Sequence, residues 1–382
     1  MSQIQLTLSE NYVKSWDYWE AVRELLQNGL DQEIRDNTNV FSFEAKDINS
    51  DLGLCTLYFH NKYGKLDPGS LVMGYSDKDE NQVGQFGEGY KLALLVLTRL
   101  GVKVTIHNQT DAWGVVFKQS RKLKTRLLTI TMEKNTLSNN GLTIIVEGVP
   151  ISFLDELKDK WIGMHDMYKK VVNRNFELLT EKEYQSKVFV NGLFVHEFPN
   201  EEFIYGYNFK PGQIELDRDR RSVDSFNLAY TIGKTGVSPD RTFNFNAIKK
   251  NARDMEYYFS HNTDNDLADM VFDDYQKEFG EDTFPVEYCE YEEFKKIPGY
   301  KPQMFDSGAR AQAIINSPKY QTFVDEVRKH KIIVREPYEV LQEFYQKHLK
   351  YYTENFESIN DPTFIIEAFQ EILDQSENWS NS

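Results

Sequence analysis

The part of the sequence that most restricts the fold is an apolar helix-like segment followed directly by four strand-like segments. Residues 91–101 (KLALLVLTRLG) form an apolar run that ends in glycine, which is typical of a buried helix. The runs after it alternate in polarity and are separated by hairpin-length gaps; they span 102–108, 113–119, 127–133 and 142–148. A helix followed by consecutive hairpin-connected strands predicts an α+β domain whose helices cover one face of a mixed sheet.

The segments around this region extend the pattern to more than one domain. Residues 12–36 read as one long helix, and residues 39–48 and 54–60 alternate in polarity as strands do. From residue 283, strand-like and helix-like segments alternate, which is typical of a small α/β domain. Because 382 residues exceed what one hydrophobic core usually holds, we expect two or three domains, and the order of the segments favours three. They are residues 1–150, 151–282 and 283–382.

Charge and composition exclude several classes of protein. The chain carries 44 basic and 60 acidic residues, a formal net charge of −16, whereas a protein that binds nucleic acid over its whole surface is usually basic. We therefore expect a protein partner or a homodimer, and DNA or RNA only through a local basic patch. No apolar run approaches the ~18–20 residues of a membrane helix, the N-terminus lacks an export signal, and Cys55 and Cys289 lack zinc-site spacing. These features predict a cytoplasmic protein.

The first helix carries a polar face with residue types that suit metal-assisted hydrolysis. In RELLQNGLD, residues 23–31, Glu24, Asn28 and Asp31 fall on one side of the helix at 100° per residue, and the leucines fall on the other. An Asn oxygen can bind Mg²⁺, and a Glu one turn away can orient or deprotonate a water. By itself, the pattern also fits an ordinary amphipathic helix whose polar side faces solvent.

A glycine-rich segment leads into the apolar helix. In GQFGEGYK, residues 84–91, the glycines are spaced three and two apart just before the helix. Backbone N–H groups in such a segment can close around phosphate oxygens, and the start of the helix adds partial positive charge. The segment is not a Walker A motif, since no GKS or GKT follows, and not a Rossmann motif, since no strand leads into it. A flexible turn is the simpler alternative.

Together these motifs resemble those of the GHKL ATPase superfamily, which includes gyrase, the ninety-kilodalton heat-shock chaperone, histidine kinases and MutL. AVRELLQNGLD is similar to the family's N-box, GQFGEGYKLA to its second glycine box, and GLTIIV, residues 141–146, to its later Gly-Thr strand. MGYSDK, residues 73–78, is most similar to the MORC-type branch. The resemblance covers roughly residues 15–148. It implies the α/β sandwich known as the Bergerat fold, a transducer-like α/β unit after it, and ATP and Mg²⁺ as cofactors.

The resemblance also implies roles for individual residues. Glu24 would be the general base that activates water, and Asn28 the Mg²⁺ ligand. Thr143 would reach the adenine side, and Lys91 would either pair with phosphate or carry a solvated charge. The nucleotide-binding residues implied in this way are Asn28, Asp31, Asn61, Gly64, Gly84, Gln85, Phe86, Gly87, Glu88, Gly89, Lys91 and Thr143.

One motif departs from the family pattern. The family's first glycine box reads Asp-x-Gly-x-Gly, and its Asp accepts a hydrogen bond from the adenine amino group, whereas this chain has HNKYG at residues 60–64. His60 replaces the Asp, and only Gly64 remains. A carboxamide oxygen can also accept from an amino group, so Asn61 is the expected substitute. Loss of one buried hydrogen bond would cost on the order of 1–3 kcal/mol, which would weaken binding and leaves the choice of base open.

A cation for the γ-phosphate has several candidates. In GHKL proteins the transducer domain usually reaches a basic residue back to this phosphate. Arg218 and Arg220, in the charged run at residues 217–222, and Lys234 are the alternatives in this chain. A surface cluster whose charges pair with one another is the simpler interpretation.

These features predict a Mg²⁺-dependent ATPase that turns over slowly and uses nucleotide to drive a conformational or dimerisation switch. The alternative is a nucleotide-gated binding protein or inhibitor with little or no hydrolysis, which the altered HNKYG segment favours and the intact Glu24 and Asn28 oppose. A third reading is an interaction protein that keeps the fold without nucleotide. Compact GHKL proteins of this kind resemble bacterial and phage rIIA-like ATPases, some of which act in host–phage conflict. The resemblance thus implies a prokaryotic or phage protein of the host cytoplasm.

Overall fold

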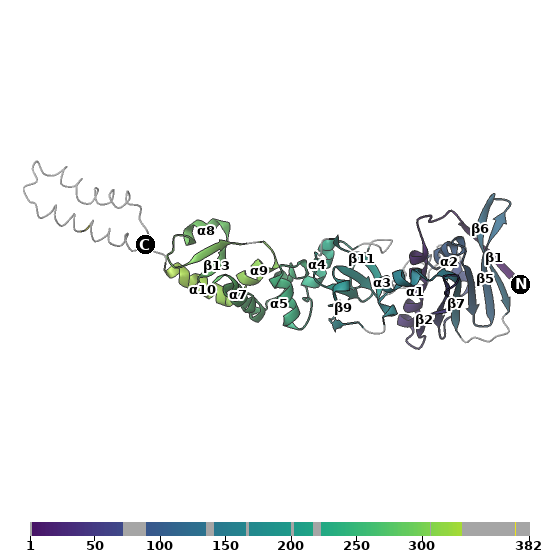
Figure 1. Cartoon of the computed structure of the whole chain (residues 1–382), viewed down its shortest axis with the longest axis horizontal. Helices are drawn as coiled ribbons and strands as arrows, with labels where there is room; N and C mark the ends of the chain where they lie inside the picture. Colours follow the sequence, from purple (N-terminus) through teal and green to yellow (C-terminus); the bar gives the residue numbers. More distant parts are fainter. Residues whose placement is uncertain are drawn as a thin grey trace, which may run out of the picture. The chain divides into compact units, whose positions relative to one another are not determined.

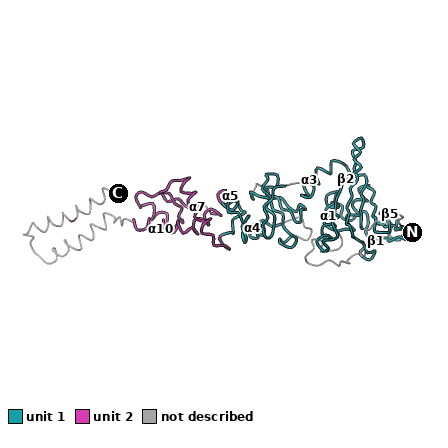
Figure 2. Tube along the Cα trace, turned by 90° about the horizontal axis from the view of Figure 1, so that it is seen from below, with its two compact units in different colours: residues 1–247, 252–258 teal, residues 248–251, 259–382 magenta. Residues whose placement is uncertain are grey.

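The computed structural model describes residues 2–71, 89–134, 141–165, 168–199, 202–216, 223–305 and 307–330, together with Glu371. The chain divides into two compact units (Figure 2). Unit 1 consists of residues 1–247 and 252–258, and unit 2 consists of residues 248–251 and 259–382. Within the described residues, no helix is long and apolar enough to cross a membrane.

Unit 1 begins with a seven-stranded sheet (Figure 1). Its strands are β1 (Ser2–Ser9), β2 (Phe41–Asn49), β3 (Leu54–Asn61), β4 (Lys103–Asn108), β5 (Asp111–Ser120), β6 (Thr125–Lys134) and β7 (Leu142–Pro150). They lie in the order β1-β6-β5-β4-β7-β3-β2, and all neighbours are antiparallel. The four strand-like runs are confirmed as β4 to β7. The prediction that this sheet is mixed is wrong. Hairpins join β4 to β5 and β5 to β6, and strands joined by hairpins are antiparallel.

Two helices pack against this sheet, α1 (Tyr18–Arg35) and α2 (Gly89–Arg99). α1 packs against α2, β2 and β3, and α2 packs against β4 and β5. The helix expected from residue 12 begins only at Tyr18, because Asp17 caps it. The Asp17 carboxylate accepts from the backbone of the first turn, and the Glu20 carboxylate accepts from the Asp17 N–H at 2.8 Å. This capping box determines where α1 starts and therefore which residues it carries toward the sheet.

The alternation of side chains along β3 and β7 separates two faces of the sheet. Phe59 of β3 and Leu142 and Ile144 of β7 belong to the hydrophobic core that includes the apolar residues of α1 and α2. Successive side chains of a strand point to opposite faces. His60 and Thr143, which lie next to these residues in sequence, therefore point away from the helices.

A second, five-stranded sheet completes unit 1, with the order β11-β10-β12-β9-β8. Only β10 and β12 are parallel neighbours in it. Its strands are β8 (Lys170–Val172), β9 (Phe176–Leu179), β10 (Lys187–Val190), β11 (Leu193–Glu197) and β12 (Gly206–Phe209). Trp161 joins the two sheets: its ring lies 5.1 Å from that of Phe43 between centroids, and its backbone forms a β-bridge with Leu193.

Short helices follow each of these sheets in the chain, and the last two residues of α5 already belong to unit 2. They are α3 (Phe153–Lys160), α4 (Ser225–Gly233) and α5 (Arg241–Lys249), with 3₁₀ turns at Pro68–Leu71, Ile162–Met164, Lys182–Tyr184 and Arg253–Met255. The ring of Tyr18, at the start of α1, lies 5.6 Å from that of Phe153 in α3. α3 therefore packs directly on the first turn of α1.

Unit 2 contains a parallel pair of strands, β13 (Thr283–Val286) and β14 (Lys301–Met304). Its helices are α6 (Tyr258–His261), α7 (Asn265–Phe279), α8 (Tyr288–Phe294), α9 (Ala309–Ile315) and α10 (Pro318–Lys329). The alternation of strand and helix expected from residue 283 is confirmed as far as residue 330. The division into three domains stays a prediction; α7, which precedes residue 283, packs against α9, α10 and β13.

Candidate functional site

The polar face of α1 is buried. Arg23, Glu24, Gln27 and Asp31 are 6%, 8%, 3% and 1% exposed, and Asn28 is half-buried. The interpretation of this face as an ordinary solvated side of an amphipathic helix is therefore wrong. Burying charged and amide side chains costs free energy unless partners or a ligand compensate. We therefore take this face as the candidate site.

Glu24 lies between a cation and the start of α2. Its Oε1 accepts a hydrogen bond from Arg23 Nη2 at 3.0 Å, and both side chains are buried. Its Oε2 lies against the Cα of Gly89, the first residue of α2, so closely that a side chain at position 89 would overlap it. The start of a helix carries partial positive charge and favours an anion. The predicted base is thus held by Arg23 at Oε1, while its Oε2 lies close to the start of α2.

Asn28 and Asp31 follow Glu24 along the same face, and Lys91 lies in the first turn of α2. The Asn28 amide nitrogen donates to the Glu24 backbone oxygen at 2.6 Å, one turn earlier. Asp31 and Lys91 are each only 1% exposed. The alternative reading of Lys91 as a solvated charge is therefore wrong.

Asn61 is fixed on the helix side of β3. Its amide nitrogen donates to the Gly29 carbonyl of α1 at 3.0 Å and toward the Asn39 carbonyl at 3.5 Å. Two carbonyl partners require the nitrogen at this position, so the side-chain oxygen points the other way and can only accept. Gly64 packs against it: the Gly64 N–H donates to the Asn61 carbonyl at 3.2 Å, and a Cβ at position 64 would lie 2.9 Å from the Asn61 Cβ.

Thr143 lies on the other face of the sheet. Its hydroxyl is 2.9 Å from Nδ1 of His60, and the two residues are directly paired across β7 and β3. The structure thus brings Thr143 together with His60, the residue that stands where the family has an aspartate. It does not bring Thr143 together with Glu24 and Asn28, which lie on the helix side.

Several of the predicted site residues lie outside the residues that the structure describes. They are Gly84, Gln85, Phe86, Gly87, Glu88, Arg218 and Arg220. Lys234 is described: its ammonium lies 4.4 Å from the ring centroid of Tyr230 in α4. The described part of the chain contains no group of three or more His, Cys, Asp or Glu side chains that could hold a metal ion. Mg²⁺ does not need one, because it is commonly bound by one or two protein oxygens together with phosphates.

Among the buried polar atoms beside the site, Nε2 of Gln27 in α1 and the hydroxyl of Tyr90 in α2 have no hydrogen-bond partner within the described residues. Burial also raises the pKa of Tyr90. Neither Gln27 nor Arg23 was among the site residues predicted from the sequence. Gln27 could have been found, because it lies 60° from Glu24 around the helix. Arg23 could not, because adjacent residues on a helix point 100° apart and this ion pair needs a bent side chain.

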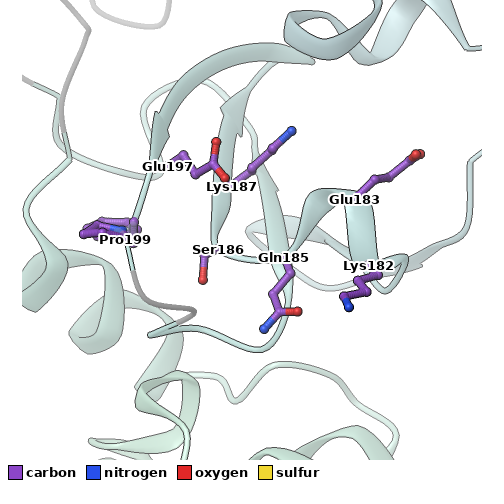
Figure 3. A pocket seen from close by; sticks show the side chains of 8 residues that line it. Lys182, Glu183, Gln185, Ser186, Lys187, Glu197 and Pro199 are labelled. Atoms are coloured by element: carbon purple, nitrogen blue, oxygen red, sulfur yellow. The ribbon is translucent and has the colours of Figure 1, made fainter.

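A cavity of about 550 Å³ lies elsewhere in unit 1 (Figure 3). Figure 3 shows Lys187 and Glu197, which are paired across β10 and β11, on one side of it. The other lining residues are Lys182, Glu183, Gln185, Ser186, Phe198 and Pro199. Positive and negative side chains alternate around this cavity, and it belongs to the second sheet rather than to α1 and α2.

Comparison with known proteins gives distant similarities. No family model matches. An uncharacterized protein of Mycoplasma pneumoniae (strain ATCC 29342 / M129 / Subtype 1) is 24% identical over 226 residues, 56% of this chain and 88% of that protein. The B subunit of DNA gyrase from Myxococcus xanthus is 9% identical, with 63% of this chain and 93% of that chain covered and a TM-score of 0.30. The N-terminal domain of a DNA repair protein is 11% identical, with 51% and 89% covered and a TM-score of 0.24. At these values, the case for a function depends on the geometry of the site.

Proposed function

We propose that this chain binds a Mg²⁺–adenine nucleotide between α1, the start of α2 and the end of β3, and hydrolyses it slowly to drive a conformational or dimerisation switch. The observation that carries the proposal is the buried polar face of α1 beside the glycine that begins α2. The Glu24 carboxylate is buried there against the start of α2, Asn28 lies one turn further along the same face, and Lys91 is buried in the first turn of α2. Phosphoryl transfer requires positioned groups of these kinds, because catalysis comes mainly from orientation and charge stabilisation.

Asn61 supports adenine as the base. Its nitrogen is committed to two backbone carbonyls, so its oxygen presents an acceptor as an aspartate would. The amino group of adenine can donate to that oxygen, whereas guanine carries an acceptor at the equivalent ring position. A site built to pair with one polar group rejects an analogue that lacks it. ATP is therefore favoured over GTP.

Glu24 and Asn28 divide the hydrolytic roles in this proposal. Glu24 orients and deprotonates the attacking water, and Asn28 offers its amide oxygen to the metal, since its nitrogen donates to the helix. Mg²⁺, when bound with the nucleotide, neutralises charge on the phosphates. Lys91 adds a buried positive charge in the first turn of α2.

A nucleotide-gated binding protein with little hydrolysis is the second candidate, and one observation favours it. The Arg23 guanidinium holds one oxygen of Glu24 at 3.0 Å, and the other oxygen lies against Gly89. A carboxylate that is held in an ion pair at one oxygen and enclosed by the start of α2 at the other has little room to reach an attacking water. Nucleotide could then control shape or partner binding while turnover stays minimal.

Thermal unfolding tests the proposal. The wild type and Asn28→Ala would be compared with Mg²⁺ and, in turn, ATP, ADP, GTP and a non-hydrolysable ATP analogue. Ligand at a hundredfold excess over Kd should stabilise the wild type by about 2.7 kcal/mol, a shift of a few degrees. The shift should be larger with ATP than with GTP and should vanish in Asn28→Ala. No shift with any nucleotide would leave an interaction protein as the remaining reading.

Phosphate release then separates the two candidates. The wild type should release phosphate from ATP, and Glu24→Ala should lose this activity while retaining the thermal shift. If the wild type shows the shift but releases no phosphate, the chain is a nucleotide-gated binding protein. Sedimentation with and without the ATP analogue measures whether binding promotes a homodimer.

A further inference from the structure

At position 89 it is the lack of room for a side chain, and not the backbone conformation, that favours glycine. Its φ lies outside the left-handed region, so an L-residue can adopt the same backbone. The obstacle is Glu24: a Cβ at position 89 would overlap Oε2 and would lie 2.8 Å from Cδ and 3.4 Å from Cγ of that side chain. The end of the Glu24 side chain therefore lies directly over the Cα of Gly89.

This contact completes the enclosure of Glu24. Arg23 Nη2 holds Oε1 at 3.0 Å, and the missing side chain of Gly89 provides the space for Oε2. Glu24 is 8% exposed, so the carboxylate has little room to adopt another position. Any side chain at position 89 has to move the carboxylate, because the carboxylate is the movable end of a long side chain and Gly89 is backbone.

We infer that Gly89 is a positioning residue for Glu24, in addition to any contact that its backbone makes with phosphate. The inference rests on the proposed function, in which Glu24 is the base. A methyl group at position 89 displaces the carboxylate from both Arg23 and the start of α2, and leaves the nucleotide-binding groups of Asn28 and Asn61 in place. Gly89→Ala should therefore impair turnover much more than nucleotide binding.

A double-variant cycle tests this inference. Gly89→Ala would be made in the wild type and in Glu24→Ala. Tm without nucleotide and Kd for Mg²⁺–ATP would be measured for each protein, and turnover for the two that retain Glu24. In the wild type, Gly89→Ala should lower Tm by about 2–8 °C, as overpacking does. Turnover should fall at least about tenfold, while Kd changes less than about threefold. In the Glu24→Ala background, Gly89→Ala should leave Tm unchanged or raise it by about 1–2 °C, because alanine is the better helix former.

The Glu24→Asp background distinguishes a positioning role of Gly89 from a purely structural one. The shorter side chain draws the carboxylate back from position 89. Gly89→Ala should therefore cost a smaller factor in turnover in the Glu24→Asp background than in the wild type.

Two outcomes would overturn the inference. One is an equal loss of Tm from Gly89→Ala with and without the Glu24 side chain, because the methyl group would then collide with something else. The other is a loss of ATP affinity greater than about tenfold in both backgrounds, because the glycine would then act on the nucleotide directly. If the proposed function itself is wrong, neither the wild type nor any variant binds ATP. The Tm values of the wild type, the two single variants and the double variant would still decide whether Gly89 positions Glu24.

Discussion

Asp254 offers the clearest test of how burial governs the stability of unit 1. It lies in the segment 252–258 and is fully buried. Its carboxylate accepts hydrogen bonds from the Tyr207 hydroxyl and from the Ile204 N–H, the latter at 3.0 Å. Burial raises the pKa of this carboxyl from 3.8 to about 6, although the hydrogen bonds act in the opposite direction. The folded state therefore holds the proton more tightly than the unfolded chain does.

The sign and size of the effect follow from this difference in pKa. Below about pH 4 the carboxyl is protonated in both states, and its contribution to stability is greatest. Between about pH 4 and 6 the unfolded chain releases the proton first, so the free energy of unfolding falls as pH rises. Above the folded pKa of about 6 the loss is complete. A difference of about two pH units is worth about 3 kcal/mol, of which about 2 kcal/mol falls between pH 4.5 and 8.

We expect Asp254→Asn to remove this dependence on pH. The amide keeps an acceptor for the Ile204 N–H and a donor for the Tyr207 oxygen, and it carries no charge. Urea unfolding, followed by tryptophan fluorescence, measures the free energy of unfolding of both proteins at each pH. All other titrating groups are shared, so the difference between the proteins isolates Asp254. From pH 4.5 to 8 the variant should gain about 2 kcal/mol relative to the wild type.

Asp240→Asn is the matched control. Asp240 is exposed, and hydrogen bonds from Thr242 lower its pKa. Its contribution is lost as pH falls, so any difference from the wild type should run in the opposite direction. The reasoning on Asp254 would be refuted if its difference from the wild type stayed constant within about 0.5 kcal/mol over the whole range.

Three further substitutions test the packing around α1, each by urea unfolding at pH 7. Gly29→Ala should lower the free energy of unfolding by about 1–3 kcal/mol, because a Cβ there would overlap the Phe41 ring and lie 2.9 Å from its Cζ; a more stable variant would contradict this contact. Asn61→Asp should cost about 1–3 kcal/mol, because a carboxylate would face the Gly29 and Asn39 carbonyls without a donor; unchanged stability would mean that the amide does not hold α1. Arg23→Ala should cost about 3–5 kcal/mol, because Glu24 would remain buried without its guanidinium, and Arg23→Met with Glu24→Gln should recover most of that loss. A double variant no more stable than Arg23→Ala would argue against the ion pair as the cause.

The strands of the first sheet could be predicted from the sequence because local patterning determines them. The runs at 102–148 alternate in polarity, and their hairpin-length gaps bring neighbours together, as in β4 to β7. The pairing of β7 with β3 and of β1 with β6 could not be predicted in this way. It depends on contacts between segments far apart in the chain, which carry no local signal.

The candidate site was predictable in its residue types but not in its environment. Helical periodicity placed Glu24, Asn28 and Asp31 on one face, and the structure keeps them there. Periodicity does not say what covers a polar face, so the burial of this face by neighbouring elements came only from the structure. The face of the sheet on which Thr143 lies could not be predicted from the sequence either, because it depends on the register of β7 against β3.

The position of β1 at the edge of the seven-stranded sheet has a consequence for synthesis of the chain on the ribosome. Ser2 pairs with Met132, so β1 is synthesised before its partner strand β6, which lies about 130 residues later in the chain. At ~5–20 residues per second this delay is roughly 6–26 s. During that time the nascent segment SQIQLTLS has no partner strand within its own chain, and it is open to pairing with other chains. Slower translation between β1 and β6 would lengthen this period and should increase co-translational aggregation.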